Sequence, residues 1–221
     1  MEEIRKNLTL YGRKIVEKGL VSGAGGNISV RSSNYLLLSP SGFFLDEINP
    51  EEWVKTNIKS GKVYGQLKPS SEILMHLNIY NNRKDVNAVI HTHPPLTIGL
   101  ISADVKLRPI SPEYVLLFGN KIPIIKYFLP GSEKLSIEVT KQLKEEKNVV
   151  LLKNHGTVCI GKTLKEAFAR SCLLEETSKS ILAGSLLGKV KYLTNKRQKK
   201  FKYHINRKYR EILLRDECFK S

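Results

Sequence analysis

The sequence predicts an α/β fold in a single domain, and three features of the chain carry this prediction. Short apolar runs typical of buried strands are interspersed with longer segments whose apolar residues recur at the spacing of amphipathic helices. The length of 221 residues suits one domain with a full hydrophobic core, or at most two small domains. Neither an internal repeat nor a linker divides residues 1–187, so these strands and helices belong to one folding unit.

The first element is an amphipathic helix at residues 3–19, ending at Gly19, a residue type common at helix C-termini. The glycine-rich segment Ser22–Gly26 follows, and its backbone is free to turn and to expose N–H groups to an anion. An ordinary turn is the alternative, and the spacing does not match a nucleotide-binding P-loop. The next predicted elements are strands at 28–31 and 35–39, a turn at 40–42, a helical turn at 49–53 with Trp53 in the core, and a strand with a hairpin at 57–63.

The segment Lys68–His76 predicts the start of a second helix, because two serines and a glutamate precede an apolar periodic run. The unpaired N–H groups of a helix N-terminus suit a phosphate, which Ser70 and Ser71 would bind there. Glu72 in the first turn also has a simpler explanation, since an acidic side chain complements the helix dipole. His76, one turn further on, is either a metal ligand or a helix-packing residue, and packing is favoured.

In the segment Val89–Pro95 and the residue before it, Ala88 to Ile90 form an apolar, β-branched run that predicts a buried strand. Residues two apart on a strand project from the same face, so His91 and His93 should lie side by side at its end. Pro94 and Pro95 stop the strand, because neither donates a backbone hydrogen bond. Two imidazoles held in this way supply half of a tetrahedral zinc site, although a pair of inert hydrogen-bonded histidines has the same pattern.

A further buried strand at 148–152 delivers His155, followed by Gly156, at its end. A histidine next to glycine can approach a metal closely, and a hydrogen-bonded polar group at a turn is the alternative. The remaining predicted elements are a helix at 94–100, a proline-broken loop at 107–114, short strands around 122–125, a charged helix at 133–146, a strand at 157–160 and a long helix at 163–187.

Charge is concentrated at the C-terminal end of the chain. The net charge is +16, and the segment Lys189–Ser221 holds 12 Lys and Arg against 3 acids. Such an excess suits nucleic acid, an acidic surface or an anionic substrate, but bases in a tail more often form a solvated face. Three widely spaced cysteines make neither a disulfide framework nor a zinc knuckle, which favours a reducing cytoplasm. No apolar run reaches the roughly 18–20 residues of a membrane span, and no signal peptide is predicted.

Five motifs, taken in order, resemble those of the class II aldolase/adducin family, whose simplest members are fuculose-phosphate-type aldolases. The resemblance covers about residues 5–187. The motifs are Gly26-Asn27-Ile28-Ser29, Ser41-Gly42, Pro69-Ser70-Ser71-Glu72, His91-Thr92-His93 and Asn154-His155-Gly156.

The resemblance implies a three-layer α/β/α sandwich around a mainly antiparallel sheet, usually assembled as a homotetramer. It implies a catalytic domain at residues 1–188, followed by the basic tail at 189–221. It also implies the roles of site residues. The zinc would be held by His91, His93 and His155, and a substrate phosphate would be bound by Gly26, Asn27, Ser41, Gly42, Ser70 and Ser71.

The implied reaction is cleavage of a phosphorylated ketose, a ketose 1-phosphate, to dihydroxyacetone phosphate and an aldehyde. Zinc on three histidines keeps open positions and acts as a Lewis acid on the developing enediolate. Glu72, which can also bind the zinc in this family, would carry a proton to and from the enediolate carbon. Three imidazoles would also hold manganese, cobalt or iron(II), although zinc is favoured.

Two tyrosines depart from the family pattern. A tyrosine in the loop equivalent to residues 111–114 is the family's proton donor, and here Tyr114 is the nearest, with Pro112 in the expected place. The family's C-terminal tail carries a second tyrosine that acts at the aldehyde end. Tyr209 is its counterpart here, in a much more basic tail.

Other functions share parts of this pattern. Pentulose-phosphate 4-epimerases use the same zinc site but carry Asp in place of Glu72, which favours an aldolase. Methylthioribulose-phosphate dehydratases retain the Glu and stay open, as do aldolases for 5-deoxypentulose 1-phosphates. Adducin-like binding modules would be expected to lack the metal ligands, which are all present. Nucleic-acid binding by Lys196–Tyr203, where aromatic residues lie among bases, is disfavoured, and no membrane partner is expected.

Overall fold

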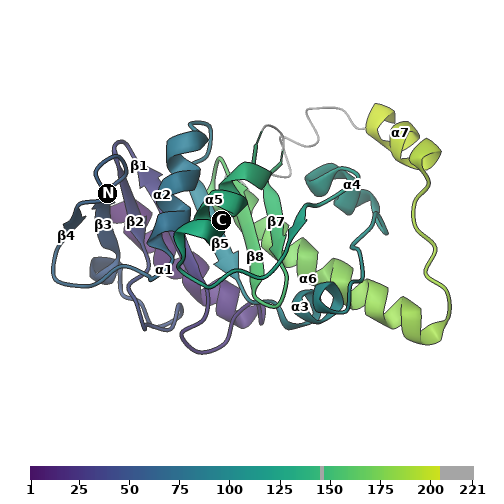
Figure 1. Ribbon diagram of the computed structural model, residues 1–221, viewed down its shortest axis with the longest axis horizontal. Helices are drawn as coiled ribbons and strands as arrows, with labels where there is room; N and C mark the ends of the chain where they lie inside the picture. The colour runs from purple at the N-terminus through teal and green to yellow at the C-terminus, as the bar shows by residue number, and fades with distance from the viewer. Residues whose placement is uncertain (145–146, 205–221) are drawn as a thin grey trace.

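The structure is a computed structural model that describes residues 1–144 and 147–204, and in it one sheet lies between two layers of helices (Figure 1). Among the described residues the sheet has eight strands, in the spatial order β4-β3-β2-β1-β5-β8-β7-β6. Neighbouring strands are antiparallel except β6 and β7, which are parallel. The predicted three-layer sandwich with a mainly antiparallel sheet is therefore confirmed. The strands are β1 (Asn27–Ser32), β2 (Tyr35–Leu38), β3 (Val54–Asn57), β4 (Val63–Tyr64), β5 (Ala88–Thr92), β6 (Ile124–Ile125), β7 (Val149–Leu152) and β8 (Gly156–Gly161).

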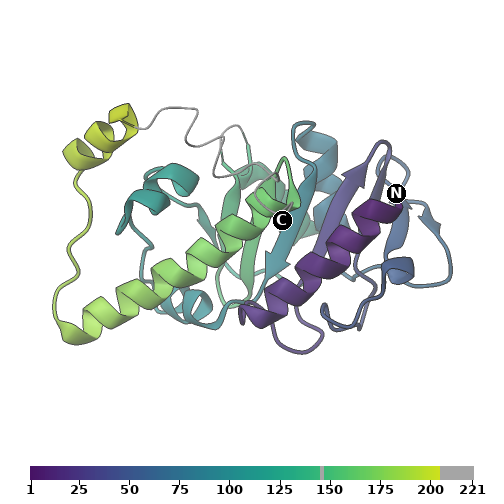
Figure 2. The same ribbon diagram turned by 180° about the vertical axis from the view of Figure 1, so that it is seen from behind.

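Apolar residues on both faces of the central strands explain why helices cover the sheet on both sides. In β5, Val89 packs into the core on one face, whereas Ala88 and Ile90 pack on the other, because successive strand residues point to opposite faces. The first face carries α2 and α5 (Figure 1), and α1 and α6 cross the opposite face (Figure 2). Two short helices, α3 and α4, contact α6. The helices are α1 (Glu2–Glu17), α2 (Ile73–Asn82), α3 (Pro95–Ser102), α4 (Pro112–Phe118), α5 (Glu133–Gln142) and α6 (Leu164–Leu187), with a 3₁₀ turn η1 (Pro50–Glu52).

The segment predicted as a proline-broken loop is a loop only in its first part, because α4 begins at Pro112. Proline is tolerated in the first turn of a helix, where its missing N–H would have no helical partner. The hydroxyl of Ser111 accepts the N–H of Tyr114 at 3.3 Å and caps the helix. The loop prediction was therefore wrong from residue 112 onward.

Most other boundaries agree with the sequence. The predicted end of α1 is confirmed, since Gly19 has a φ of 65° and its N–H bonds the carbonyl oxygen of Val16 at 2.8 Å. Helix α5 ends at Gln142, four residues before its predicted end. Residues 57–63 are mainly the turn between β3 and β4, because the side-chain oxygen of Asn57 accepts two backbone N–H groups there.

The basic tail packs against the body of the protein as far as it is described. Helix α7 (Asn195–His204), which the sequence did not predict, contacts α4. The N–H of Leu193 donates to the carbonyl oxygen of Pro109 at 2.8 Å, and the guanidinium of Arg108 lies 4.4 Å from the ring centre of Tyr192. None of the described helices combines the length and apolar character that crossing a membrane requires.

A buried carboxylate connects the helix after His93 to the long helix α6. Glu175, which is 3% exposed, accepts the N–H groups of Leu96 and Thr97 at 3.1 and 3.0 Å. It also accepts the Thr97 hydroxyl at 2.8 Å. N–H groups in the first turn of a helix have no carbonyl oxygen of the same helix to bond. The carboxylate of Glu175 supplies hydrogen-bond acceptors for these groups in α3. The start of α3, two residues beyond His93, is fixed in this way.

Replacing Glu175 by alanine is expected to lower the free energy of unfolding by about 3 kcal/mol, because buried donors lose a charged acceptor. Urea denaturation followed by circular dichroism measures this change. Glu176, the residue next to Glu175, is the matched control, since it is exposed and pairs with Lys179 at the surface. Glu176→Ala should leave the free energy of unfolding nearly unchanged. Equal effects of the two substitutions would contradict this role of Glu175.

Candidate functional site

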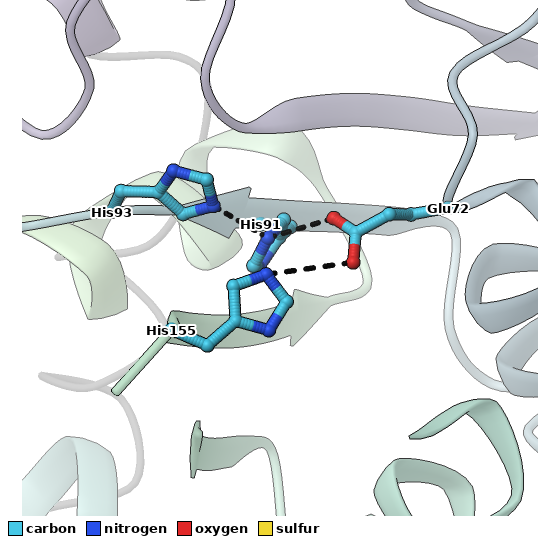
Figure 3. Close-up of side chains that lie close together, drawn as sticks. All are labelled: Glu72, His91, His93 and His155. Atoms are coloured by element: carbon cyan, nitrogen blue, oxygen red, sulfur yellow. Dashed lines mark hydrogen bonds and ion pairs between the residues drawn. The ribbon is translucent and has the colours of Figure 1, made fainter. Parts of the chain in front are cut away.

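Four of the predicted site residues converge beside the end of the central strand β5 (Figure 3). They come from separate segments: His91 from β5, His93 from the residue after β5, His155 from the turn between β7 and β8, and Glu72 from the position just before α2. The antiparallel register pairs His91 with Val158 of β8, so the turn that carries His155 lies beside the end of β5.

One potential ligand atom from each of these side chains lies within 4.8 Å of the other three. The Nε2 atom of His91 is 2.9 Å from Nε2 of His93 and 2.8 Å from Oε2 of Glu72. The Nε2 atom of His155 is 3.6 Å from Oε1 of Glu72. Three imidazole nitrogens and a carboxylate therefore face a common point. Within residues 1–144 and 147–204, no other group of three His, Cys, Asp or Glu side chains is close enough to share an ion.

The orientation of His91 is set by a backbone contact on its far side. Its Nδ1 lies 2.9 Å from the carbonyl oxygen of Thr157, so this nitrogen donates a hydrogen bond. In the neutral ring the lone pair of Nε2 then points to the other members of the cluster. Metal-binding histidines are commonly fixed through their second nitrogen in this way.

Burial and mutual charge effects set the protonation of the cluster. Burial lowers the pKa of His93 to about 3 and that of His155 to about 4, with His91 contributing, so both rings are neutral at pH 7. Burial raises the pKa of Glu72, but attraction to His91, aided by His155 and Asn27, outweighs it and holds this pKa below its usual value. Burial lowers the pKa of His91, and its attraction to Glu72 reverses the direction of the shift.

This set of groups fits a divalent cation. A cation among Glu72 and His91 takes over the role of the proton that they would otherwise share. The nitrogens of His91 and His93 face each other, and a single cation can accept lone pairs from both. The buried Oε1 of Glu72 has no hydrogen-bond partner within the described part of the chain. Imidazole nitrogens and a carboxylate are the ligands that catalytic zinc sites use.

Gly156 allows the histidines to come together. A methyl group at this position would lie 2.8 Å from Cδ2 of His93 and 3.2 Å from Cε1 of His91, and would collide with the carbonyl oxygen of Thr92. A glycine in a strand often marks such a close approach of another backbone. The residue after His155 therefore has to be a glycine, which has no side chain.

Gly156→Ala is expected to displace both histidines and to weaken zinc binding at least about ten-fold. Competition with a chromophoric chelator measures the affinity. Gly99→Ala in α3 is the matched control, because an added methyl group there meets no atom within 4 Å. It should leave zinc affinity unchanged, and an unchanged affinity in Gly156→Ala would count against the site.

The segments predicted to bind phosphate lie beside one another. The loop Ser41–Gly42 adjoins the segment Lys68–Ser71, because the N–H of Ser41 donates to the carbonyl oxygen of Lys68 at 2.9 Å. On the other side, the N–H of Ser39 donates to the carbonyl oxygen of Ile28 in β1 at 3.1 Å. Ser41, Gly42 and Ser71 are exposed, whereas Ser70 is buried. Gly26 lies against the cluster, since a methyl group there would be 2.7 Å from the carbonyl oxygen of His91.

The side chain of Asn27 is already engaged with other residues of the site. Its Nδ2 donates to Oε2 of Glu72 at 3.0 Å, and its Oδ1 lies 2.5 Å from Nε2 of His76. His76 is fully buried and also contacts the Ser29 hydroxyl at 2.7 Å, in keeping with the packing role that the sequence favoured. The part played by Ser29 was not predicted. The sequence pattern that could have indicated this part is the polar residue at every second position of β1, on the face of the sheet that carries His91.

Of the two predicted tyrosines the structure describes only Tyr114, which packs in a hydrophobic core cluster rather than with the four residues. Tyr114 is fully buried in α4, where burial raises its pKa. Its hydroxyl donates to the carbonyl oxygen of Leu107 at 2.9 Å. In this position Tyr114 belongs to the hydrophobic core, and its packing gives no support to a proton-donor role. Tyr209 lies outside the described residues.

Known proteins resemble this chain over most of its length. Residues 6–182 match the family described as Class II Aldolase and Adducin N-terminal domain. The chain is 35% identical to the L-fuculose phosphate aldolase of Methanocaldococcus jannaschii, over 84% of this chain and 99% of that protein. It is 34% identical to the 5-deoxy-D-ribulose 1-phosphate aldolase of Bacillus thuringiensis, over 76% of this chain and 79% of that protein. It is 31% identical to the 3-oxo-tetronate 4-phosphate decarboxylase of Pectobacterium atrosepticum, over 87% of this chain and 89% of that protein.

The fold has a close match among solved structures. An L-fuculose 1-phosphate aldolase superposes with a TM-score of 0.84 at 28% identity, and the match covers 93% of this chain and 98% of that chain. Sequence and architecture thus point to the same group of proteins.

Proposed function

Because the chain belongs to the class II aldolase and adducin family and is a carbon–carbon lyase of that type, we propose that it cleaves a ketose 1-phosphate. The products are dihydroxyacetone phosphate and an aldehyde. The observation that carries the proposal is the convergence of Glu72 with three histidines beside the exposed serine segments. Relatives named for L-fuculose phosphate and 5-deoxy-D-ribulose 1-phosphate support the substrate class.

In this proposal His91, His93 and His155 hold a divalent cation, with Glu72 as a further ligand in the resting protein. Zinc is proposed because this ligand set suits it. When bound, the cation supplies Lewis acidity toward the ketone and the adjacent hydroxyl and stabilises the charge of an enediolate. The neutral state of His93 and His155 at pH 7 supports their role as ligands.

Glu72 is the proposed acid and base. Its Oε2 accepts a hydrogen bond from Nδ2 of Asn27, which leaves the buried Oε1 to exchange a proton. In cleavage the C3–C4 bond breaks and the C4 hydroxyl passes its proton to solvent as the aldehyde forms, while Oε1 takes up a proton from solvent and gives it to C3 of the enediolate. In condensation Oε1 takes that proton back.

The substrate phosphate is proposed to bind at the exposed residues Ser41, Gly42 and Ser71, where the two serines offer hydroxyl groups, next to the buried Ser70. This segment runs directly into Glu72, so a phosphate bound there would place the sugar near the cluster. Gly26 and Asn27 would contribute through their backbone, because the Asn27 side chain is engaged with Glu72 and His76.

A second candidate reaction is decarboxylation of a 3-oxo acid 4-phosphate, which the likeness to a 3-oxo-tetronate 4-phosphate decarboxylase favours. Loss of CO₂ from 3-oxo-tetronate 4-phosphate leaves the same enediolate, and protonation by Glu72 gives dihydroxyacetone phosphate again. The two reactions differ in the other product, which is CO₂ in one case and an aldehyde in the other.

A coupled assay for dihydroxyacetone phosphate on zinc-loaded protein tests the proposal. The substrates are fuculose 1-phosphate, ribulose 1-phosphate, 5-deoxyribulose 1-phosphate and 3-oxo-tetronate 4-phosphate. Release from a ketose 1-phosphate with an aldehyde as the second product is expected. Release only from the 3-oxo acid would favour the decarboxylase. No release from any of them with zinc bound would overturn both readings, and 4-epimerisation and methylthioribulose-phosphate dehydration would then be tested on the same preparation.

We further propose that residues 1–188 form a catalytic domain that assembles as a homotetramer in the cytoplasm. Exposed apolar side chains near α5 support association, with Tyr127 52%, Leu129 69% and Ile137 53% exposed. Light scattering in solution measures the assembled mass, and a monomer at micromolar concentration would contradict the tetramer.

A further inference from the structure

A chain of hydrogen bonds leads from the interior of the protein to the carboxylate of Glu72. Its four members, Tyr80, Ser29, His76 and Asn27, are at most 4% exposed. The Tyr80 hydroxyl lies 2.9 Å from the Ser29 hydroxyl, which lies 2.7 Å from Nδ1 of His76. The chain continues from Nε2 of His76 to Oδ1 of Asn27 at 2.5 Å and from Nδ2 of Asn27 to Glu72 at 3.0 Å.

The carboxylate fixes the direction of every bond in this chain. An ionised carboxylate only accepts hydrogen bonds, so the amide nitrogen of Asn27 has to face Glu72. The amide oxygen then faces Nε2 of His76, and that nitrogen has to carry a proton. If the proton were on Nδ1, Nε2 would carry only a lone pair. The Asn27 oxygen would then face either this lone pair or, with the amide turned over, the carboxylate, and both contacts are repulsive.

The rest of the chain agrees with this assignment. Burial lowers the pKa of His76 to about 3, so the ring carries one proton and Nδ1 is an acceptor at neutral pH. The Ser29 hydroxyl donates to Nδ1, and the Tyr80 hydroxyl donates to the oxygens of Ser29, which lie 2.9 Å (hydroxyl) and 3.0 Å (carbonyl) away. Each donor of the chain meets an acceptor, as buried polar networks require.

We propose that His76 is a positioning residue that acts through Asn27 to hold the Glu72 carboxylate in place for proton transfer. With Oε2 held by Asn27, Oε1 is turned to the site where the substrate carbon would lie. Loss of the His76 N–H frees the Asn27 amide to rotate, and Glu72 then loses a fixed orientation. This inference rests on the proposed role of Glu72 as acid and base.

The position of the proton on His76 is the first test. Nitrogen NMR of zinc-loaded wild-type protein at pH 7 distinguishes the two neutral forms of an imidazole. A neutral ring with the proton on Nε2 is expected. A proton on Nδ1 would overturn the proposal.

The second test separates the two ends of the His76 ring. The amide nitrogen of His76→Gln reaches about the position of Nε2, whereas that of His76→Asn reaches only about the position of Nδ1. Exchange of solvent deuterium into dihydroxyacetone phosphate measures the Glu72 step without any aldehyde. Exchange at saturating substrate should fall about 10- to 100-fold in His76→Asn and remain close to wild type in His76→Gln. Zinc content and the KM for dihydroxyacetone phosphate should be the same in both.

Asn78→Leu is the matched control on the same helix, because the Asn78 amide bonds Ser136 of α5 at 2.7 Å and lies outside the chain to Glu72. It should exchange deuterium at the wild-type rate. Wild-type protein without exchange would refute the proposed function itself. Normal wild-type exchange, with His76→Asn as fast as His76→Gln, would refute the role of His76. If His76→Asn does not fold, the proton position in wild-type protein decides.

Discussion

Replacing Glu72 by glutamine is expected to lower kcat for dihydroxyacetone phosphate release by about a thousand-fold, the range general acid–base catalysis supplies. Glutamine has nearly the same shape and still accepts the Asn27 hydrogen bond, so the fold and the three histidines should be retained. An amide cannot take up and return a proton at Oε1. Steady-state kinetics on zinc-loaded protein, with zinc content measured on the same sample, gives the result.

The matched control is Glu113→Gln. Glu113 is an exposed acid in the first turn of α4, which is the dipole-complementing role that also suited Glu72 on the sequence alone. Its replacement should leave kcat unchanged. A Glu72→Gln protein that keeps its zinc and more than about a tenth of the wild-type kcat would contradict the acid/base role.

His93→Ala is expected to weaken zinc binding at least about 100-fold and to remove activity at equimolar zinc. Loss of a ligand should exceed the 10- to 100-fold cost of losing an outer partner of a ligand. The Nε2 atom of His93 faces His91, and the ring lies at the end of β5, so the fold should survive its removal. Chelator competition gives the affinity, and circular dichroism checks the fold.

His76→Gln is the matched histidine control, because His76 contacts Ser29 and Asn27 and is not a member of the four-residue cluster. It should bind zinc as tightly as wild-type protein. Equal zinc affinity in His93→Ala and wild-type protein would contradict the assignment of the ligands.

The convergence of the histidines was predictable because it depends on local regularities. A two-residue repeat places His91 and His93 together at the end of β5, and a buried strand followed by glycine delivers His155. The same regularity of apolar runs predicted most of the sheet. Where one residue satisfies two local rules, however, the sequence does not choose between them, as Pro112 illustrates by starting a helix in a segment read as loop.

The partners of Glu72 depend on contacts between distant segments, and the sequence could not give them. Asn27 and His76 are 49 positions apart and meet only because α2 packs on the face of β1 that carries Asn27. A polar residue at every second position of a strand ordinarily indicates a solvated face, and in β1 it lines a buried network instead. Tyr114 illustrates the opposite case, because a residue placed by family resemblance packs in the core.

Titration of the metal against activity on one preparation tests the central claim most directly. Zinc is removed with a chelator and returned in steps, and zinc content and dihydroxyacetone phosphate release are measured at each step. Activity should disappear with the zinc and return in proportion to it, reaching its maximum at one ion per chain, and His93→Ala should show neither response. Full activity in protein stripped of all divalent metal would contradict the proposed centre at Glu72, His91, His93 and His155.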